Sequence, residues 1–261
     1  MKKLFVTAIL SSLLIVGLTG CSSVNNSKNE WKTEVEKIPG VISAVVPEPE
    51  DSEPAASLSI TILGQEKYYP EIETQLCEAG AKLEEATPIT LIVSDGKGAK
   101  INVFTETKCP EISTSYARIW RTVNQVLPES QLNIHPDTNT YAICENCDIP
   151  LQQEEVTALL IGIMPELEEP FTFKTKVSAS YTPQSPVPVT FQGNKKEAVS
   201  LTTVLRYLET PIEAPRKITV NNGTMKISYY PSTISQQKLE ATQAEIQNLV
   251  QTLTIETNTD E

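Results

Sequence analysis

Five cysteines, Cys21, Cys77, Cys109, Cys144 and Cys147, are the most reactive side chains of the 261-residue chain. The last two form a C-x-x-C motif. This spacing suits thiol–disulfide exchange, because one thiolate can attack a disulfide and the other can resolve the mixed disulfide. The same spacing also suits a closed structural disulfide, or half of a zinc site made of four thiolates. The motif therefore leaves three chemistries open.

Two of these three chemistries are disfavoured by the sequence. Glu145, Asp148, Glu154 and Glu155 surround the motif in sequence, and negative charge raises the pKa of a thiol. A zinc site would need a second C-x-x-C pair, which the chain lacks. We therefore expect a structural disulfide at this motif.

The rest of the chain holds no other catalytic pattern. His135 is the only histidine, and one imidazole cannot build a His-based triad or a multi-His metal site. It precedes Pro136 in a predicted turn, which is an ordinary place for a polar residue. Adjacent acidic pairs such as Glu154 and Glu155 diverge from a surface, and no phosphate-binding or nucleophile-elbow motif is present. We expect no catalytic residue, no metal site and no cofactor.

The N-terminus has the pattern of an export signal. Lys2 and Lys3 precede an uncharged apolar run over residues 4–18, which is short for a membrane-spanning helix. Its end, Leu18-Thr19-Gly20-Cys21, resembles the lipobox of bacterial lipoproteins. The resemblance implies that a diacylglyceryl group, with acyl chains such as palmitate, is attached to Cys21 after cleavage before it. Residues 1–20 are then a signal peptide and residues 21–29 a polar tether.

An exported body keeps four cysteines, and an even number in an oxidising compartment predicts two disulfides. Four cysteines allow three pairings. Cys144 and Cys147 can close on each other, which leaves Cys77 to meet Cys109 between two predicted neighbouring helices. The C-x-x-C motif also resembles that of thioredoxin-like oxidoreductases, with Pro188 in place of their cis-proline, although Ile143 stands where they usually have Trp. A membrane-tethered thiol-disulfide oxidoreductase using Cys144 and Cys147 is thus the alternative function.

Net charge limits the partners. The chain has 21 Lys and Arg against 33 Asp and Glu, a formal charge of −12. A polyanion partner needs a basic face, so this balance argues against nucleic acid. Residues 1–20 contain two lysines and no acid, so the exported body is more acidic still. We expect contact with the membrane through the lipid at Cys21, and an envelope protein as a further partner.

Helical periodicity recurs about every 42 residues. Six amphipathic stretches are centred near residues 35, 76, 119, 158, 203 and 244. Two strand-like runs with a turn signal lie between each consecutive pair, for example residues 89–94 and 100–105 around Asp95-Gly96. The repeating unit is therefore helix, strand, strand.

Two such units in tandem match the split βαβ pattern of ferredoxin-like folds. The predicted fold class is α+β, with tandem ferredoxin-like units whose antiparallel sheets carry helices on one face. The piece Pro39-Gly40-Val41 also resembles the helix-to-strand joint of BON-type envelope modules. The predicted divisions are an N-terminal αβ half-unit with an acidic loop (30–56), two ferredoxin-like units (57–135 and 136–220) and a C-terminal βαβ half-unit (221–261).

Two segments are predicted to lie outside regular structure. Residues 47–56 hold four acids and three prolines and are expected to form a solvated loop. Residues 181–188 hold three prolines and are expected to be an irregular crossing. A two-lobed solute-binding lipoprotein does not fit the 42-residue period. The sequence therefore predicts a non-enzymatic binding or structural protein, anchored to the extracytoplasmic side of a membrane, whose contact surfaces are uncovered sheet faces and the edges between units.

Overall fold

The computed structural model describes residues 20–47, 57–83, 87–144, 150–179, 182–208, 215–231 and 233–259, and for residues 20–26, 179 and 182–185 it describes the backbone alone. The predicted signal peptide lies outside these ranges except for Gly20. Most of the acidic loop and Cys147 also lie outside them.

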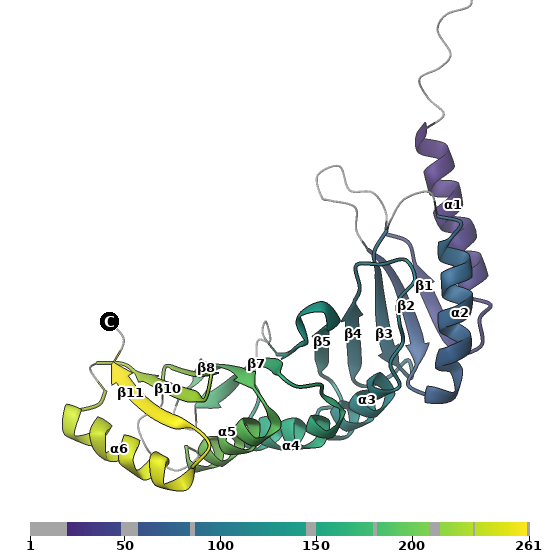
Figure 1. Cartoon of the computed structure of the whole chain (residues 1–261). Helices are drawn as coiled ribbons and strands as arrows, with labels where there is room; N and C mark the ends of the chain where they lie inside the picture. Colours follow the sequence, from purple (N-terminus) through teal and green to yellow (C-terminus); the bar gives the residue numbers. More distant parts are fainter. Residues whose placement is uncertain are drawn as a thin grey trace, which may run out of the picture.

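The described chain forms an α+β fold in which one mixed sheet of eleven strands is lined by six helices. Figure 1 shows the helices along one face of the sheet and a bend in the array between α2 and α4. The elements are α1 (Gly20–Val35), β1 (Val41–Val45), β2 (Leu58–Leu63), α2 (Tyr69–Gly80), β3 (Ile89–Ser94), β4 (Lys100–Phe104), α3 (Ser115–Val126), β5 (Gln131–His135), β6 (Thr140–Ile143), α4 (Gln153–Ile163), β7 (Phe171–Ala179), β8 (Thr182–Gly193), α5 (Lys195–Tyr207), β9 (Lys217–Asn221), β10 (Thr224–Tyr229), α6 (Gln236–Leu249) and β11 (Thr254–Thr259).

Strand order in the sheet is the same as strand order in the sequence. The two strands of each helix–strand–strand unit pair antiparallel as a hairpin. The strand after each of α2 to α6 pairs in parallel with the strand before that helix. The sheet therefore grows by two strands per unit in one direction, and the sixth unit contributes α6 and β11.

The predicted helices and strands are present, but the predicted assembly into tandem ferredoxin-like units with antiparallel sheets is wrong. In a split βαβ unit, the strand after a helix leaves a gap that a later strand fills, so neighbouring strands are antiparallel. Here that strand occupies the adjacent position and the sheet is mixed. Both arrangements bury the same alternate residues, so periodicity could not separate them. The expected boundaries after residues 135 and 220 fall within the β5–β6 and β9–β10 hairpins.

Two predicted irregular segments are regular in the structure. Residues 21–29, expected to be a tether, belong to α1, which continues to Val35. Most of residues 181–188, expected to be an irregular crossing, belong to β8, where Pro188 pairs with Lys176 of β7. A proline inside a strand lacks only the donor that points to one neighbour, so alternate prolines can be tolerated where that donor is not used.

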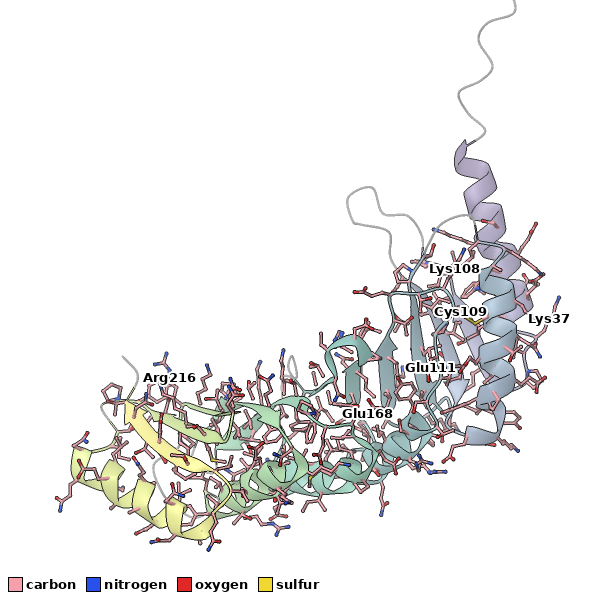
Figure 2. All side chains as sticks on the ribbon, in the orientation of Figure 1. Lys37, Lys108, Cys109, Glu111, Glu168 and Arg216 are labelled. Atoms are coloured by element: carbon pink, nitrogen blue, oxygen red, sulfur yellow. A yellow bond between two sulfur atoms is a disulfide. The ribbon has the colours of Figure 1, made fainter. Side chains whose placement is uncertain are left out.

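A single apolar cluster fills the space between the sheet and the helix layer along the whole array, from Trp31 on α1 to Ile255 on β11. Strand residues alternate between this core and the opposite face, as a half-covered sheet requires. In β2, for example, Leu58, Ile60 and Ile62 are fully buried, while the residues between them are partly exposed. Figure 2 shows the length of the array, with Lys37 beside α1 near one end and Arg216 near the other.

Close contacts hold neighbouring units in register. Trp120 of α3 is buried and donates from Nε1 to the carbonyl oxygen of Ala99 at 2.9 Å. Its ring packs on Gly64, where a Cβ atom would lie 2.2 Å from the Trp120 ring. Only glycine therefore fits at this position. The indole thus ties the end of β2 and the start of β4 to α3.

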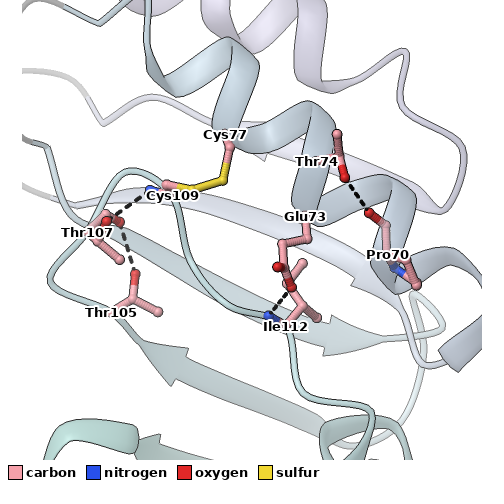
Figure 3. Close-up of a disulfide and its surroundings, with 8 residues drawn as sticks. All are labelled: Pro70, Glu73, Thr74, Cys77, Thr105, Thr107, Cys109 and Ile112. Carbon is pink, nitrogen blue, oxygen red and sulfur yellow. Dashed lines mark hydrogen bonds between the residues drawn. A yellow bond between two sulfur atoms is a disulfide. The ribbon is translucent and has the colours of Figure 1, made fainter.

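The predicted disulfide between Cys77 and Cys109 is present, with the two Cα atoms 4.4 Å apart. It joins α2 to the segment that leads from β4 to α3, as Figure 3 shows. Glu73, one turn earlier on α2, accepts a hydrogen bond from the backbone N–H of Ile112 at 2.8 Å. A Cβ atom on Gly80 would lie 2.4 Å from the carbonyl oxygen of Lys108, so α2 and this segment are in close backbone contact.

Replacing Cys77 and Cys109 together by alanine should lower the free energy of unfolding. The bridge closes a separation of 32 residues, and loop closure of this length restricts the unfolded chain by about 3–4 kcal/mol. Denaturant unfolding of the double variant measures the loss. Thr74→Ala on the exposed side of the same helix is the control, with a change within about 0.5 kcal/mol. Equal stability of the double variant and the wild type would contradict the assignment of a stabilising bridge.

Alkaline pH should destabilise the fold through two buried tyrosines. Burial is the main cause that raises the pKa of Tyr116 and of Tyr141 to about 12 each. In the unfolded chain these phenols ionise near pH 10, so the folded state holds more protons above that pH. The free energy of unfolding should then be constant up to about pH 10 and fall between about 10 and 12. Denaturant unfolding at stepped pH measures this fall in the free energy of unfolding. The Tyr141→Phe variant should show a smaller fall. Ionisation of all eight tyrosines together near pH 10 in the native protein would contradict the prediction.

Candidate functional site

Cys144 lies directly after β6 and is disulfide-bonded and 6% exposed. Its backbone has a positive φ of 58°, a conformation that non-glycine residues rarely adopt. Cys147, the partner that the sequence predicts, lies outside the described residues. The chain is described again from Pro150, and Leu151 forms a parallel bridge to Val177 of β7. The bonded and buried state of Cys144 favours a structural role.

The helix after the C-x-x-C motif begins with a cap of its own. α4 begins at Gln153, and Gln152 and Glu155 form a capping box in which Glu155 accepts from the Gln152 N–H at 2.7 Å. The helix N-terminus, which lowers a thiol pKa in thioredoxin-like enzymes, therefore already has a carboxylate partner. Pro188 lies two strands away from β6, within β8. The geometry gives no support to thiol–disulfide exchange.

His135 ends β5, where its side chain is exposed. Its ring stacks on Phe104 of β4, with ring centroids 4.7 Å apart and an interplanar angle of 10°. Next to this pair, Asn133 accepts from the amide of Asn102 at 3.0 Å and from that of Gln131 at 3.1 Å. The sequence indicated a turn residue at His135 and gave no sign of the stack, because the two residues are 31 positions apart.

Within the described ranges, no group of three or more His, Cys, Asp or Glu side chains could hold a metal ion. A hollow of about 370 Å³ lies at one end of β4 and β5 and is lined by Gly98, Lys100, Pro128, Glu129, Ser130 and Gln131. Its reactive side chains are those of Lys100, Glu129 and Ser130, and in the described part of the chain no hydrogen bond joins the Ser130 hydroxyl to a side chain that could activate it. We find no arrangement in it that could catalyse a reaction.

Both outer edges of the sheet are partly blocked by side chains. At one end, the backbone N–H of Ala44 in β1 donates to Glu36 at 3.2 Å. At the other end, the N–H groups of Ile255 and Thr257 in β11 donate to Gln247 and Gln243 of α6, at 2.9 and 3.4 Å. Unpaired edge groups would otherwise accept another strand. Because the units share one sheet, the edges between units that the sequence predicted as contact surfaces do not exist.

The uncovered surface is the open face, which we define as the sheet face opposite the helices. Its side chains lie in rows that cross the strands. The residue pairs of successive strands trace one such row across the whole sheet, and this row is mostly polar. It consists of Ser43, Thr61, Ile92, Asn102, Asn133, Ala142, Lys174, Thr190, Thr219, Lys226 and Glu256.

Charge on the open face is opposite in sign to the charge of the chain. The eleven strands contain five lysines and a single acid, Glu256, whereas the chain as a whole has a net charge of −12. Four of the lysines, which we call the lysine patch, lie within the four neighbouring strands β7 to β10, on all of them except β8. They are Lys174 and Lys176 on β7, Lys217 on β9 and Lys226 on β10.

The lysine patch is accessible, and its lysines form no ion pair within the described chain. Lys174, Lys217 and Lys226 are exposed and Lys176 is half-buried. Glu256 is the register neighbour of Lys226 on β11, but none of the four lysines takes part in an ion pair within the described chain. Arg216, directly before β9, lies over the ring of Tyr230, 5.4 Å from its centroid. The described geometry therefore offers a cationic binding surface.

A local sequence signal for the lysine patch exists. In β7, Lys174 and Lys176 alternate with Phe173, Thr175 and Val177, the period of a strand with one buried face. Such alternation places both lysines on the solvent side. The overall charge of the chain hid this, because net charge does not report how charges are distributed over faces.

Comparison with known proteins gives no relative from which a function could be transferred. No family model, no curated protein and no solved structure matches the chain.

Removing the side chains that block the β11 edge should promote strand-to-strand association. The variant Gln243→Ala with Gln247→Ala frees the N–H groups of Ile255 and Thr257, and an exposed row of free donors favours pairing with a second chain. Analytical ultracentrifugation should then show a larger concentration-dependent mass than for the wild type.

Gln236→Ala, on the same helix but bonded only to Glu240, is the control and should sediment like the wild type. An unchanged mass of the double variant across the concentration range would show that the two glutamines do not protect the edge.

Proposed function

We propose that this chain is a lipid-anchored extracytoplasmic protein of the bacterial envelope that acts by binding, with the open face of its sheet as the contact surface. The observation that carries the proposal is the eleven-stranded sheet with all six described helices on one face. A sheet of this kind presents a wide surface of side chains on a hydrogen-bonded backbone, and a surface of this size suits recognition better than catalysis.

The anchoring part of the proposal rests on the lipobox-like residues Leu18 to Cys21. Among the helices that the structure describes, none is long and apolar enough to cross a bilayer. In the proposal, the lipid on Cys21 makes the attachment. Two acyl chains suffice for stable attachment. Figure 1 shows the N-terminal end of α1, the helix that begins at Gly20, extending past the strands of the sheet.

The binding part rests on what the described residues lack and on what they present. They contain no metal cluster, and Cys144 is bonded and buried. The helix end after the motif has its own carboxylate cap. In contrast, the open face carries rows of hydroxyl, amide and ammonium groups, all of which can donate hydrogen bonds to a ligand.

Metabolic labelling with a palmitate analogue tests the anchor. The wild-type chain should be labelled and should partition with membranes. The Cys21→Ser variant should show neither labelling nor membrane partitioning, because only a thiol at this position accepts the lipid. Cys144→Ser is the matched control and should keep the label. Equal labelling of the wild type and Cys21→Ser would remove the anchor from the proposal.

A further inference from the structure

We propose that the lysine patch on the open face binds a linear anionic polymer of the cell envelope, a chain of sugar or polyol units that bear phosphate or carboxylate groups. This inference deepens the proposed function and rests on it for the compartment in which such polymers occur. It names the chemistry of the ligand and the part of the sheet that recognises it.

The lysines of the strands lie together on the open face of the sheet. Lysines on edge strands commonly protect a sheet against aggregation. The strands that carry the lysine patch, β7, β9 and β10, are instead each paired on both sides, so edge protection does not explain them. An acidic protein that keeps its strand cations on one face, without ion pairs to described acids, presents a local positive field to an anionic ligand.

The ammonium groups of the lysine patch recur along rows that cross the strands. Lys174 and Lys226 lie in the same row, with Thr190 and Thr219 on the two strands between them. Strands about 4.8 Å apart place these two lysines roughly 14 Å from each other along the row. Lys176 and Lys217 lie in the next row, two strands apart. A polymer that crosses the strands therefore meets repeated cations, not a single one.

Hydroxyl and amide side chains lie between and beside the lysines of the patch. Thr190 and Thr219 provide partly exposed hydroxyl groups in the row of Lys174. The row of Lys174 has a neighbouring row on the side away from Lys176 and Lys217. That row contains Thr172, Gln192, Asn221 and Thr224. Sugars and polyols are recognised by such donors and acceptors. The patch therefore offers hydroxyl and amide partners at positions where a polymer would place its neutral groups.

A membrane surface is a poorer occupant for this patch. Peripheral binding to a bilayer combines cationic residues with apolar side chains that enter the interface. Exposed large apolar residues of the described chain are Ile42, Val45, Ile161, Val199, Tyr230 and Leu249. Of these, only Tyr230 belongs to the neighbourhood of the lysine patch, and its ring is covered in part by Arg216. The patch lacks the apolar component.

Binding by the full chain, purified in detergent, tests the proposal. The probes are poly(glycerol phosphate) and polygalacturonate, which separate phosphate from carboxylate as the anionic group, and vesicles containing anionic lipid. We expect binding to at least one polymer at low ionic strength, weakening as salt is added. Lys174→Gln with Lys226→Gln should raise the Kd about 25-fold, roughly fivefold for each lysine.

The control variant is Lys37→Gln with Lys196→Gln, which removes two exposed lysines outside the sheet, one in the turn after α1 and one on α5, and changes net charge equally. Its Kd should stay close to that of the wild type. If the first pair impairs folding, as judged by thermal unfolding, Lys176→Gln with Lys217→Gln replaces it. No binding to either polymer, equal losses in patch and control variants, or binding to vesicles alone would each overturn the proposal. Because palmitate labelling is independent of these lysines, failure of the anchor and failure of the patch are distinguishable.

Discussion

Parallel pairing between the strand before a helix and the strand after it is the constraint on which the whole structure depends. It occurs at each of the five helices that connect two strands, α2 to α6. A connection of this kind needs a crossover, and the amphipathic helix supplies both the crossover and the cover for the strands beneath it. Because each new strand joins the same growing edge with its helix on the same face, the result is a continuous sheet with one covered face and one open face.

The same constraint determines where function can lie. A sheet covered on one side needs no ligand to complete its core, which runs unbroken from Trp31 to Ile255. Its edges are blocked by Glu36 at one end and by Gln243 and Gln247 at the other. The open face is left as the large surface with repeated chemistry. In a repeat protein such a surface grows with the number of units, which suits a ligand that is itself a repeating chain.

Residue patterns predicted the elements well and their assembly badly. The turn signal Asp95-Gly96, where Gly96 has a positive φ, marked the hairpin of β3 and β4 correctly, and the pairing of Cys77 with Cys109 followed from two helices lying close together. The position of a strand after its helix could not be predicted, since adjacent and skipped positions bury the same residues. The edge contacts of Gln243 and Gln247 and the stack of Phe104 on His135 depend on that position. Sequence could have located the lysine patch, because Lys174 and Lys176 alternate with buried residues of β7.

The central claim is that the open face is the contact surface, and protection of individual lysines from chemical acetylation tests it most directly. Mass spectrometry of the acetylated full chain, with and without poly(glycerol phosphate) or polygalacturonate, reports each ammonium group separately. The account predicts that a bound polymer protects Lys174, Lys217 and Lys226 while Lys37 and Lys196 stay reactive. Protection of Lys37 and Lys196 with unchanged reactivity of the lysine patch would contradict it.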